Sequence, residues 1–295
     1  MRYAAFETLI APARPSSGLG RLISGIALTL LVFVVLSIAW SNVLPMLLGP
    51  EGWSRLQPQI ATASTPTGVL VNLFTFALLI VALAVALRSV HGRGLASLVG
   101  PLPRAARQFG RALVAVLALY AVVALVPMPE GMAPERNIGL GLWIALLPLA
   151  LLALGCQVFA EEAIFRGYLQ SQLAARFASP LVWILVPAVT FGALHFDPVS
   201  YGANGWLVAV WATIFGLAAA DLTARFGTLG PATALHLLNN LSAILIAAPE
   251  GQFDGLALYS YPFSISDSDV LAALLPVDMA MLLCSWLAIR VALRG

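Results

Sequence analysis

Residues 161–166 hold the strongest candidate for chemistry in this chain. Glu161 and Glu162 are adjacent, and Arg166 follows four residues after the second of them, at the end of the apolar run 151–160. Placing a carboxylate inside a membrane costs roughly 2.5–3.5 kcal/mol on insertion scales. Charges kept at such a depth face a polar cavity and are candidates for a functional site.

The two carboxylates are expected to have different tasks. On a helix, Glu162 and Arg166 share a face and can form an ion pair. Glu161 points about 100° away from Glu162, so it stays available for chemistry. A plainer interpretation is that both carboxylates cap the end of a span among lipid headgroups.

Two further polar patterns follow in separate apolar segments. Phe191 and His195 are four residues apart, and so are His236 and Asn240. A lone His at the end of a span is often interfacial, whereas His236 and Asn240 share a helix face and require a polar partner or a cavity. The remaining His91 lies in a basic segment and is expected at the surface.

Together these side chains offer the parts needed for hydrolysis. Glu161 can serve as a general base, the imidazoles of His195 and His236 can transfer protons, and the Asn240 amide can donate to an oxyanion. No serine in a nucleophile-elbow context and no reactive cysteine stands near them, which disfavours covalent catalysis.

The composition predicts an all-α bundle of transmembrane helices. The 295 residues are 61% hydrophobic and 9% charged, with a mean hydropathy of +0.95. Such a chain is an integral membrane protein, and nothing in it indicates a nucleic-acid partner. Hydropathy predicts about eight spans, at 22–46, 67–87, 111–127, 139–160, 181–194, 205–223, 229–248 and 270–292. We expect one membrane domain, 1–295, with a catalytic core at 139–248 surrounded by helices in 1–127 and 270–295.

Charge placement orients these spans. All 15 basic residues are Arg, and with both termini in the cytoplasm only Arg55 and Arg136 fall on the outer side. This asymmetry follows the positive-inside rule and sets the orientation. The expected location is the plasma membrane, the inner membrane of a bacterium. The segment 88–110 is then the longest inner loop, and 249–269 is an outer loop that can cap the outer face.

The span map places Glu161 near the inner face and His195 near the outer end of its span. These positions differ by about 20 Å in depth at 1.5 Å per residue. A shared site therefore requires the fourth helix to continue past Glu161, to about Arg176, which moves Glu161 into the membrane.

The three motifs, Glu-Glu-x-x-x-Arg, Phe-x-x-x-His and His-x-x-x-Asn, occur in that order and resemble those of the CPBP family. This family, also called Abi, contains type II CAAX prenyl endopeptidases and bacteriocin-processing and immunity proteins. The flanking residues 165–170 and 225–231 agree, and the resemblance covers about 150–245. It implies an intramembrane endopeptidase that acts on a lipidated, CAAX-type or membrane-associated substrate.

Carried over to this chain, the resemblance gives each residue a role. Glu161 would activate water with help from His195, His236 and Asn240 would form the oxyanion site, and Glu162 and Arg166 would support the geometry. The family is also labelled as metalloprotease, and Glu161, His195 and His236 could fill three positions of a zinc site. The chain has no HExxH pattern, so the preferred mechanism requires no metal.

Two other classes of function remain open. A proton- or ion-coupled transporter would use Glu161 with Asp221, Asp278 and the imidazoles. Transporters often show repeat symmetry or paired broken helices, and neither is convincing here. A non-catalytic scaffold or immunity protein would keep the motifs for structure only. Asp221 and Asp278 are expected to be packing or helix-end carboxylates.

Overall fold

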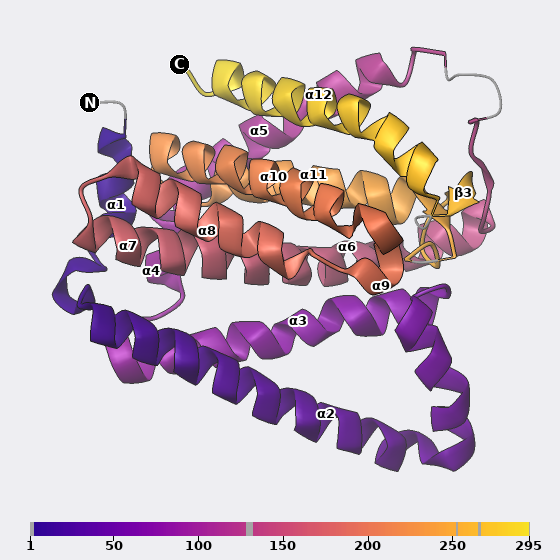
Figure 1. Ribbon diagram of the computed structural model, residues 1–295, viewed down its shortest axis with the longest axis horizontal. Helices are drawn as coiled ribbons and strands as arrows, with labels where there is room; N and C mark the ends of the chain where they lie inside the picture. Colours follow the sequence, from indigo (N-terminus) through magenta and orange to yellow (C-terminus); the bar gives the residue numbers. More distant parts are fainter. Residues whose placement is uncertain (1–2, 128–131, 252, 265–266, 295) are drawn as a thin grey trace.

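The computed structural model describes residues 3–127, 132–251, 253–264 and 267–294 (Figure 1). Its long helices are α2 (Leu19–Thr62), α3 (Pro66–Ala86), α5 (Leu102–Val123), α6 (Leu140–Glu162), α8 (Pro180–Leu194), α10 (Gly205–Phe226), α11 (Gly230–Leu241) and α12 (Ser268–Ala292). Shorter helical turns are η1 (Ala4–Phe6), α1 (Glu7–Ile10), η2 (Arg14–Ser16), η3 (Leu87–His91), α4 (Ala96–Val99), η4 (Ala163–Gln170), α7 (Ser171–Arg176), α9 (Pro198–Tyr201), η5 (Gly202–Asn204) and η6 (Ser242–Ile246). The strands are β1 (Glu135–Arg136), β2 (Ala247–Glu250) and β3 (Tyr259–Ser264).

The all-α membrane architecture is confirmed. Each predicted span has a long helix as its counterpart, in the same order along the chain. Within the described residues, six helices are long and apolar enough to cross a membrane, while α8 is a shorter apolar helix of 15 residues and α11 has 12. The expected number of spans and the cytoplasmic location of the termini stay predictions.

Two expected boundaries are wrong. The helix of the third span, α5, begins at Leu102, so the second half of the expected inner loop 88–110 is helical. Pro101 lies at the N-cap of α5 and Pro103 in its first turn, where the backbone N–H groups have no partner within the helix. The first helix continues to Thr62 through a break at Gly49, whose φ of 69° is a conformation that glycine adopts readily.

The fourth helix continues past Glu161, as the sequence predicted. The chain is helical from Leu140 to Arg176 through α6, the π-helical η4 and α7. Three residues, 177–179, then turn the chain into α8. Glu161 lies 15 residues before Arg176 and His195 lies 15 residues after Pro180, so the two antiparallel helices bring both side chains to the same depth.

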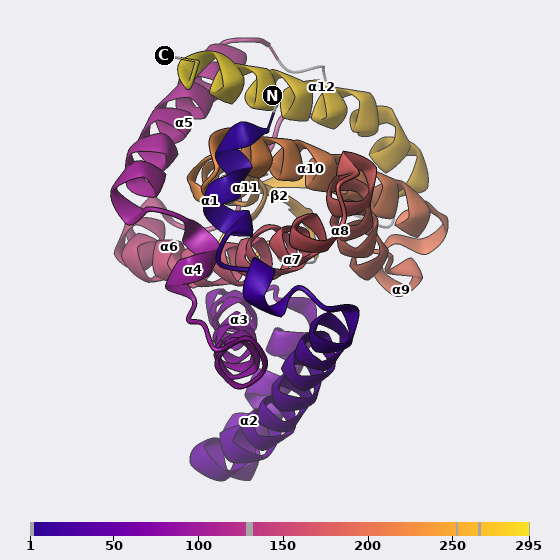
Figure 2. The same cartoon turned by 90° about the vertical axis from the view of Figure 1, so that its left-hand side faces the viewer.

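The N-terminal segment covers one end of the bundle. Phe6, Leu9 and Ala13 are fully buried, and the Tyr3 hydroxyl donates to Asp221 Oδ1 at 2.9 Å. In Figure 2, α1, α4 and α7 lie together at this end, and Figure 1 shows that both ends of the chain are close to it, opposite β3. The hydropathy profile could not predict that the N-terminal segment covers this end of the bundle, because a hydropathy profile identifies only membrane-spanning segments.

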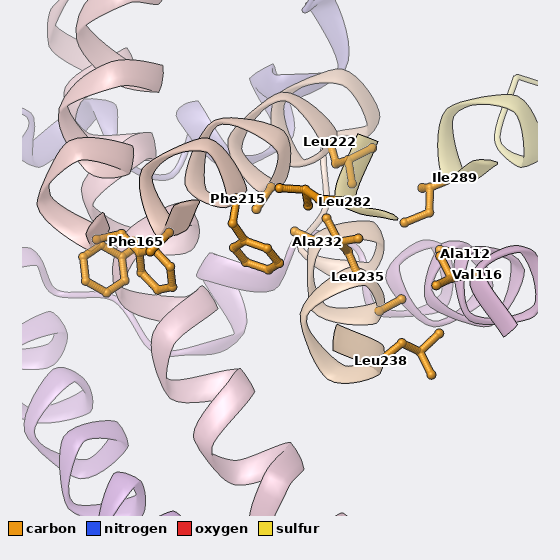
Figure 3. Packing of buried hydrophobic residues seen from close by; sticks show 14 residues of the cluster. Ala112, Val116, Phe165, Phe215, Leu222, Ala232, Leu235, Leu238, Leu282 and Ile289 are labelled. Atoms are coloured by element: carbon orange, nitrogen blue, oxygen red, sulfur yellow. The ribbon is translucent and has the colours of Figure 1, made fainter. Parts of the chain in front are cut away.

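A hydrophobic core surrounds α11. Side chains from α5, α10, α11 and α12 meet there, among them Val116, Phe215, Leu235 and Ile289, which are at most 1% exposed (Figure 3). Many of the neighbouring positions are alanine, which lets the helix backbones approach closely, as is typical of helices packed in a membrane.

The expected outer loop 249–269 is partly ordered by a small sheet. Its strand order is β1-β3-β2, with β1 antiparallel and β2 parallel to β3, and the register shifts between Pro249 and Glu250. The Asn137 amide donates to the Asp254 and Ala257 carbonyl oxygens and ties this region to the start of α6. Its capping role stays a prediction.

Close contact between α8 and α10 depends on Gly192. A Cβ atom at this position would overlap the Thr213 side chain and the Ala209 carbonyl oxygen. We expect Gly192→Ala to lower the free energy of unfolding by about 1–3 kcal/mol, measured by thermal denaturation. The control is Gly155→Ala in α6, where a Cβ would meet nothing within 4 Å. Equal stability of the two variants would contradict this close packing.

Candidate active site

One pocket between α6, α8, α10 and α11 collects every side chain predicted to do chemistry. It is lined by Gln157, Glu161, Phe191, His195, Trp211, Phe215, His236, Asn239 and Asn240. Its volume of about 50 Å³ is enough for water molecules, since one water requires about 10–15 Å³ on this measure. The tertiary structure therefore joins the three motifs in one place.

Glu162 and Arg166 form the predicted ion pair behind this pocket. Arg166 Nη1 lies 2.9 Å from Glu162 Oε1, and both side chains are at most 1% exposed. The guanidinium also lies over the Phe191 ring, 4.5 Å from its centroid. An aromatic face attracts a cation, so the ring adds to the stabilisation supplied by the carboxylate.

Glu162 has a second task that the helix spacing did not reveal. Its Oε1 also lies 2.8 Å from His236 Nδ1. A carboxylate paired with Arg166 is ionised and can only accept, so Nδ1 donates and carries a proton. This contact fixes the ring and directs His236 Nε2 toward Glu161 Oε2, 3.5 Å away.

Glu161 keeps the freedom that the sequence predicted for it. Its side chain is 12% exposed and lines the pocket. The Oε2 atom is buried and has no hydrogen-bond partner among the described residues. The separation of 3.5 Å from His236 Nε2 exceeds the usual 2.9–3.0 Å of an N–H···O hydrogen bond. A buried acceptor of this kind on a cavity wall is suited to hold water.

His195 is held by its own helix. Its Nδ1 lies 2.8 Å from the Phe191 carbonyl oxygen, which can only accept, so Nδ1 carries the proton and Nε2 is the available atom. The ring also packs on Phe191 with centroids 4.4 Å apart. Asp197, two residues later, is partly exposed. Its hydrogen bonds with Ser200 lower its pKa, and it caps α9 and does not line the pocket.

Two amide residues in the pocket were missed by the sequence interpretation. Asn239 Nδ2 donates to Asn240 Oδ1 at 3.1 Å, and Asn240 Nδ2 donates to Gln157 Oε1 at 3.0 Å. This chain of bonds orients the Asn240 amide. A signal was present, because Gln157 lies four residues before Glu161 on the same face of α6.

The carboxylates considered for an ion path do not line the pocket. Asp221 is bonded to Arg225, Tyr3 and the Trp286 indole at the covered end of the bundle, which confirms a packing role. Asp278 is likewise absent from the pocket lining.

The expected zinc ligands share the pocket without forming a ligand cluster. Across the part of the chain that the structure describes, no three or more His, Cys, Asp or Glu side chains are placed to hold one metal ion. The side chains as they stand do not fit a three-ligand site, and metal dependence stays a prediction.

The fold and the site define a polytopic helical membrane protein with a carboxylate–imidazole–amide pocket inside the bundle. Residues 142–242, about a third of the chain, match the family model described as type II CAAX prenyl endopeptidase Rce1-like. This matched segment holds the whole pocket, and it supports the similarity to the CPBP family of CAAX-type membrane proteases. No curated protein and no solved structure matches the chain.

The Glu162–Arg166 pair predicts a large loss of stability when one partner is removed. We expect Arg166→Met to cost about 3–5 kcal/mol, because it leaves a buried carboxylate without its cation. The control is Arg55→Met, which removes an exposed pair with an N···O distance of 3.9 Å and is expected to cost about 0–1 kcal/mol. Thermal unfolding in detergent measures both, and a loss below 1 kcal/mol for Arg166→Met would contradict the inferred role.

Proposed function

We propose that the protein is an intramembrane endopeptidase in which Glu161 activates water for attack on a peptide bond. The observation that carries this proposal is the unpartnered, buried Oε2 of Glu161 on the wall of a cavity with room for water. Hydrolysis requires a base and a nucleophile side by side, away from bulk solvent.

Proton movement can be written with the side chains of the pocket. Water attacks the carbonyl carbon, and its proton passes to the Glu161 carboxylate. The resulting tetrahedral oxyanion accepts hydrogen bonds from His236 Nε2 and from the second Nδ2 hydrogen of Asn240. The carbon–nitrogen bond then breaks as Glu161 returns the proton to the leaving amine. His195, with Nε2 available, orients the water or relays the proton.

Charge balance supports a protonated His236 in the oxyanion site. The buried group contains the carboxylates of Glu161 and Glu162 and the guanidinium of Arg166. With an imidazolium at His236 these charges sum to zero. A neutral cluster is favoured at low dielectric, and the Nδ1 contact with Glu162 leaves Nε2–H free to donate.

The proposed substrate is a lipidated, CAAX-type or membrane-embedded peptide of a bacterial inner membrane protein. Membrane lipids and this peptide are the expected partners. A cavity of about 50 Å³ holds water but not a peptide, so the lining side chains must move apart when the substrate binds. A transporter is disfavoured because Asp221 and Asp278 lie outside the pocket.

Glu161→Gln tests the proposed base. The amide keeps the shape of the side chain but cannot accept the proton, so we expect cleavage to fall by about 10²–10⁴-fold with unchanged thermal stability. Cleavage of a quenched prenyl-peptide and of a transmembrane peptide by the purified protein measures this. The control is Glu51→Gln, whose side chain is 94% exposed. Retained cleavage in Glu161→Gln would exclude Glu161 as the base, and Glu161-dependent ion flux without proteolysis would favour a transporter.

Metal dependence is tested on the same purified protein. We expect activity to survive chelation and elemental analysis to find no stoichiometric zinc. Stoichiometric zinc together with loss of activity on chelation would overturn the metal-free mechanism.

Gln157 is expected to act through Asn240. Removing one oxyanion donor typically costs about 10²–10³ in kcat, the loss we expect for Asn240→Ala. Gln157→Leu should cost about tenfold in kcat with little change in KM, because it releases the amide that must donate. In the double variant Gln157→Leu/Asn240→Ala, the loss of kcat should be smaller than the product of the two single losses. Independent, multiplying losses would contradict the positioning role.

A further inference from the structure

Arg93 is a buried cation for which the described residues supply no counter-ion. Its side chain is 9% exposed, and its Nε, Nη1 and Nη2 atoms are each buried with no hydrogen-bond partner among the described residues. Burial lowers its pKa to about 10, so it remains protonated at neutral pH. Buried donors are almost always paired, and an unpaired charge is the costliest exception.

The surroundings of Arg93 supply more positive charge and no carboxylate. The described acidic residues at this covered end are Glu7 and Asp221, and each is engaged by another arginine, Arg14 and Arg225 respectively. Arg21, in the first turn of α2, places a further positive charge beside the His91 ring. That turn has neither an acidic residue nor a side-chain cap, so the positive end of the helix dipole is also uncompensated.

Near Arg93, the Tyr168 hydroxyl is oriented as a donor, whereas Gln172 Oε1 is a buried acceptor without a hydrogen-bond partner among the described residues. Contrary to the expectation from the sequence, His91 is half-buried. The Gln172 amide lies 2.9 Å from its Nδ1, so Nδ1 accepts and the proton is on Nε2. Nε2 lies 2.8 Å from the Tyr168 hydroxyl oxygen and donates to it. The Tyr168 hydroxyl hydrogen is then left to donate, with only a long contact of 3.5 Å to the Leu22 carbonyl oxygen.

The position of Arg93 in the chain sets its depth. It lies two residues beyond His91, where the apolar helical segment Pro66–His91 ends. Its neighbour His91 contacts Ser16 of η2, and α4 begins three residues after Arg93. The helices α1, α4 and α7 lie together at this end of the bundle (Figure 2). The positive-inside pattern puts this end at the cytoplasmic headgroup layer, where anionic phosphates are concentrated.

We propose that Arg93, with Arg21 and the Tyr168 hydroxyl, binds a phosphate anion, supplied by a lipid headgroup or by free phosphate. A guanidinium offers five donors in a planar fork that matches the oxygens of a phosphate. Because no described carboxylate accepts these donors, an external anion is needed to accept them. The bound anion ties α2 to the segment after α3 and to η4. The site is separate from the catalytic pocket, so the proposal does not depend on the proposed function.

The test measures thermal unfolding of the full-length protein in two settings. One compares vesicles of phosphatidylcholine alone with vesicles that also contain phosphatidylglycerol. The other compares inorganic phosphate with chloride at equal ionic strength in detergent. Arg93→Gln is the variant, and Arg107→Gln, an exposed residue in the first turns of α5, is the control with the same change of charge.

We expect phosphatidylglycerol to raise the unfolding temperature of the wild type and of Arg107→Gln, and Arg93→Gln to lose about half or more of that rise. A rise with the lipid alone identifies a headgroup, and a rise with both additives identifies a general phosphate site. Should Arg93→Gln fail to fold, Arg21→Gln and Arg93→Lys should each show a reduced rise. A full rise of the unfolding temperature in Arg93→Gln would overturn the proposal. So would an unfolding temperature of Arg93→Gln above that of the wild type in every medium, because Arg93 would then be dispensable and hydrated by water alone.

Discussion

The contact on which the rest of the site depends is the one that Glu162 Oε1 makes with Arg166 and His236. It joins the fourth and seventh of the long helices at a fully buried point, and it sets which nitrogen of His236 carries a proton. The Arg166 guanidinium and the His236 N–H offset the cost of burying this carboxylate, and its position then limits where Glu161 can lie. The separation of 3.5 Å between Glu161 Oε2 and His236 Nε2 is a consequence of these buried contacts.

Near that contact, two side chains on one face of α6 have different roles. Glu161 lines the cavity, while Gln157, one turn earlier, accepts from the Asn240 amide. Asn239 holds the other end of the same amide. The Asn240 amide, the proposed oxyanion donor, is thus oriented by Gln157 and Asn239. A buried amide network of this kind is rigid only while each member has its partner.

The family match covers the segment that carries the pocket, and the remaining chain packs around that segment. The N-terminal residues 3–16 close one end of the bundle, and the sheet formed by β1, β2 and β3 orders the other. The hairpin of α2 and α3 stands to one side of the bundle, with much of α2 exposing apolar side chains that suit a lipid environment (Figure 1). Arg93, which has no hydrogen-bond partner among the described residues, follows directly after this hairpin.

The sequence by itself determined the membrane character, the order of the helices, the Glu162–Arg166 pair and the continuation of the fourth helix past Glu161. These follow from local spacing and hydropathy, which need no knowledge of which helices touch. The tertiary structure decided that Glu162 also holds His236, that Gln157 and Asn239 belong to the pocket, and that a half-buried His91 contacts Tyr168. Each of the two cross-helix contacts, Glu162–His236 and Gln157–Asn240, joins residues more than 70 positions apart, and single-sequence periodicity carries no information about such pairings.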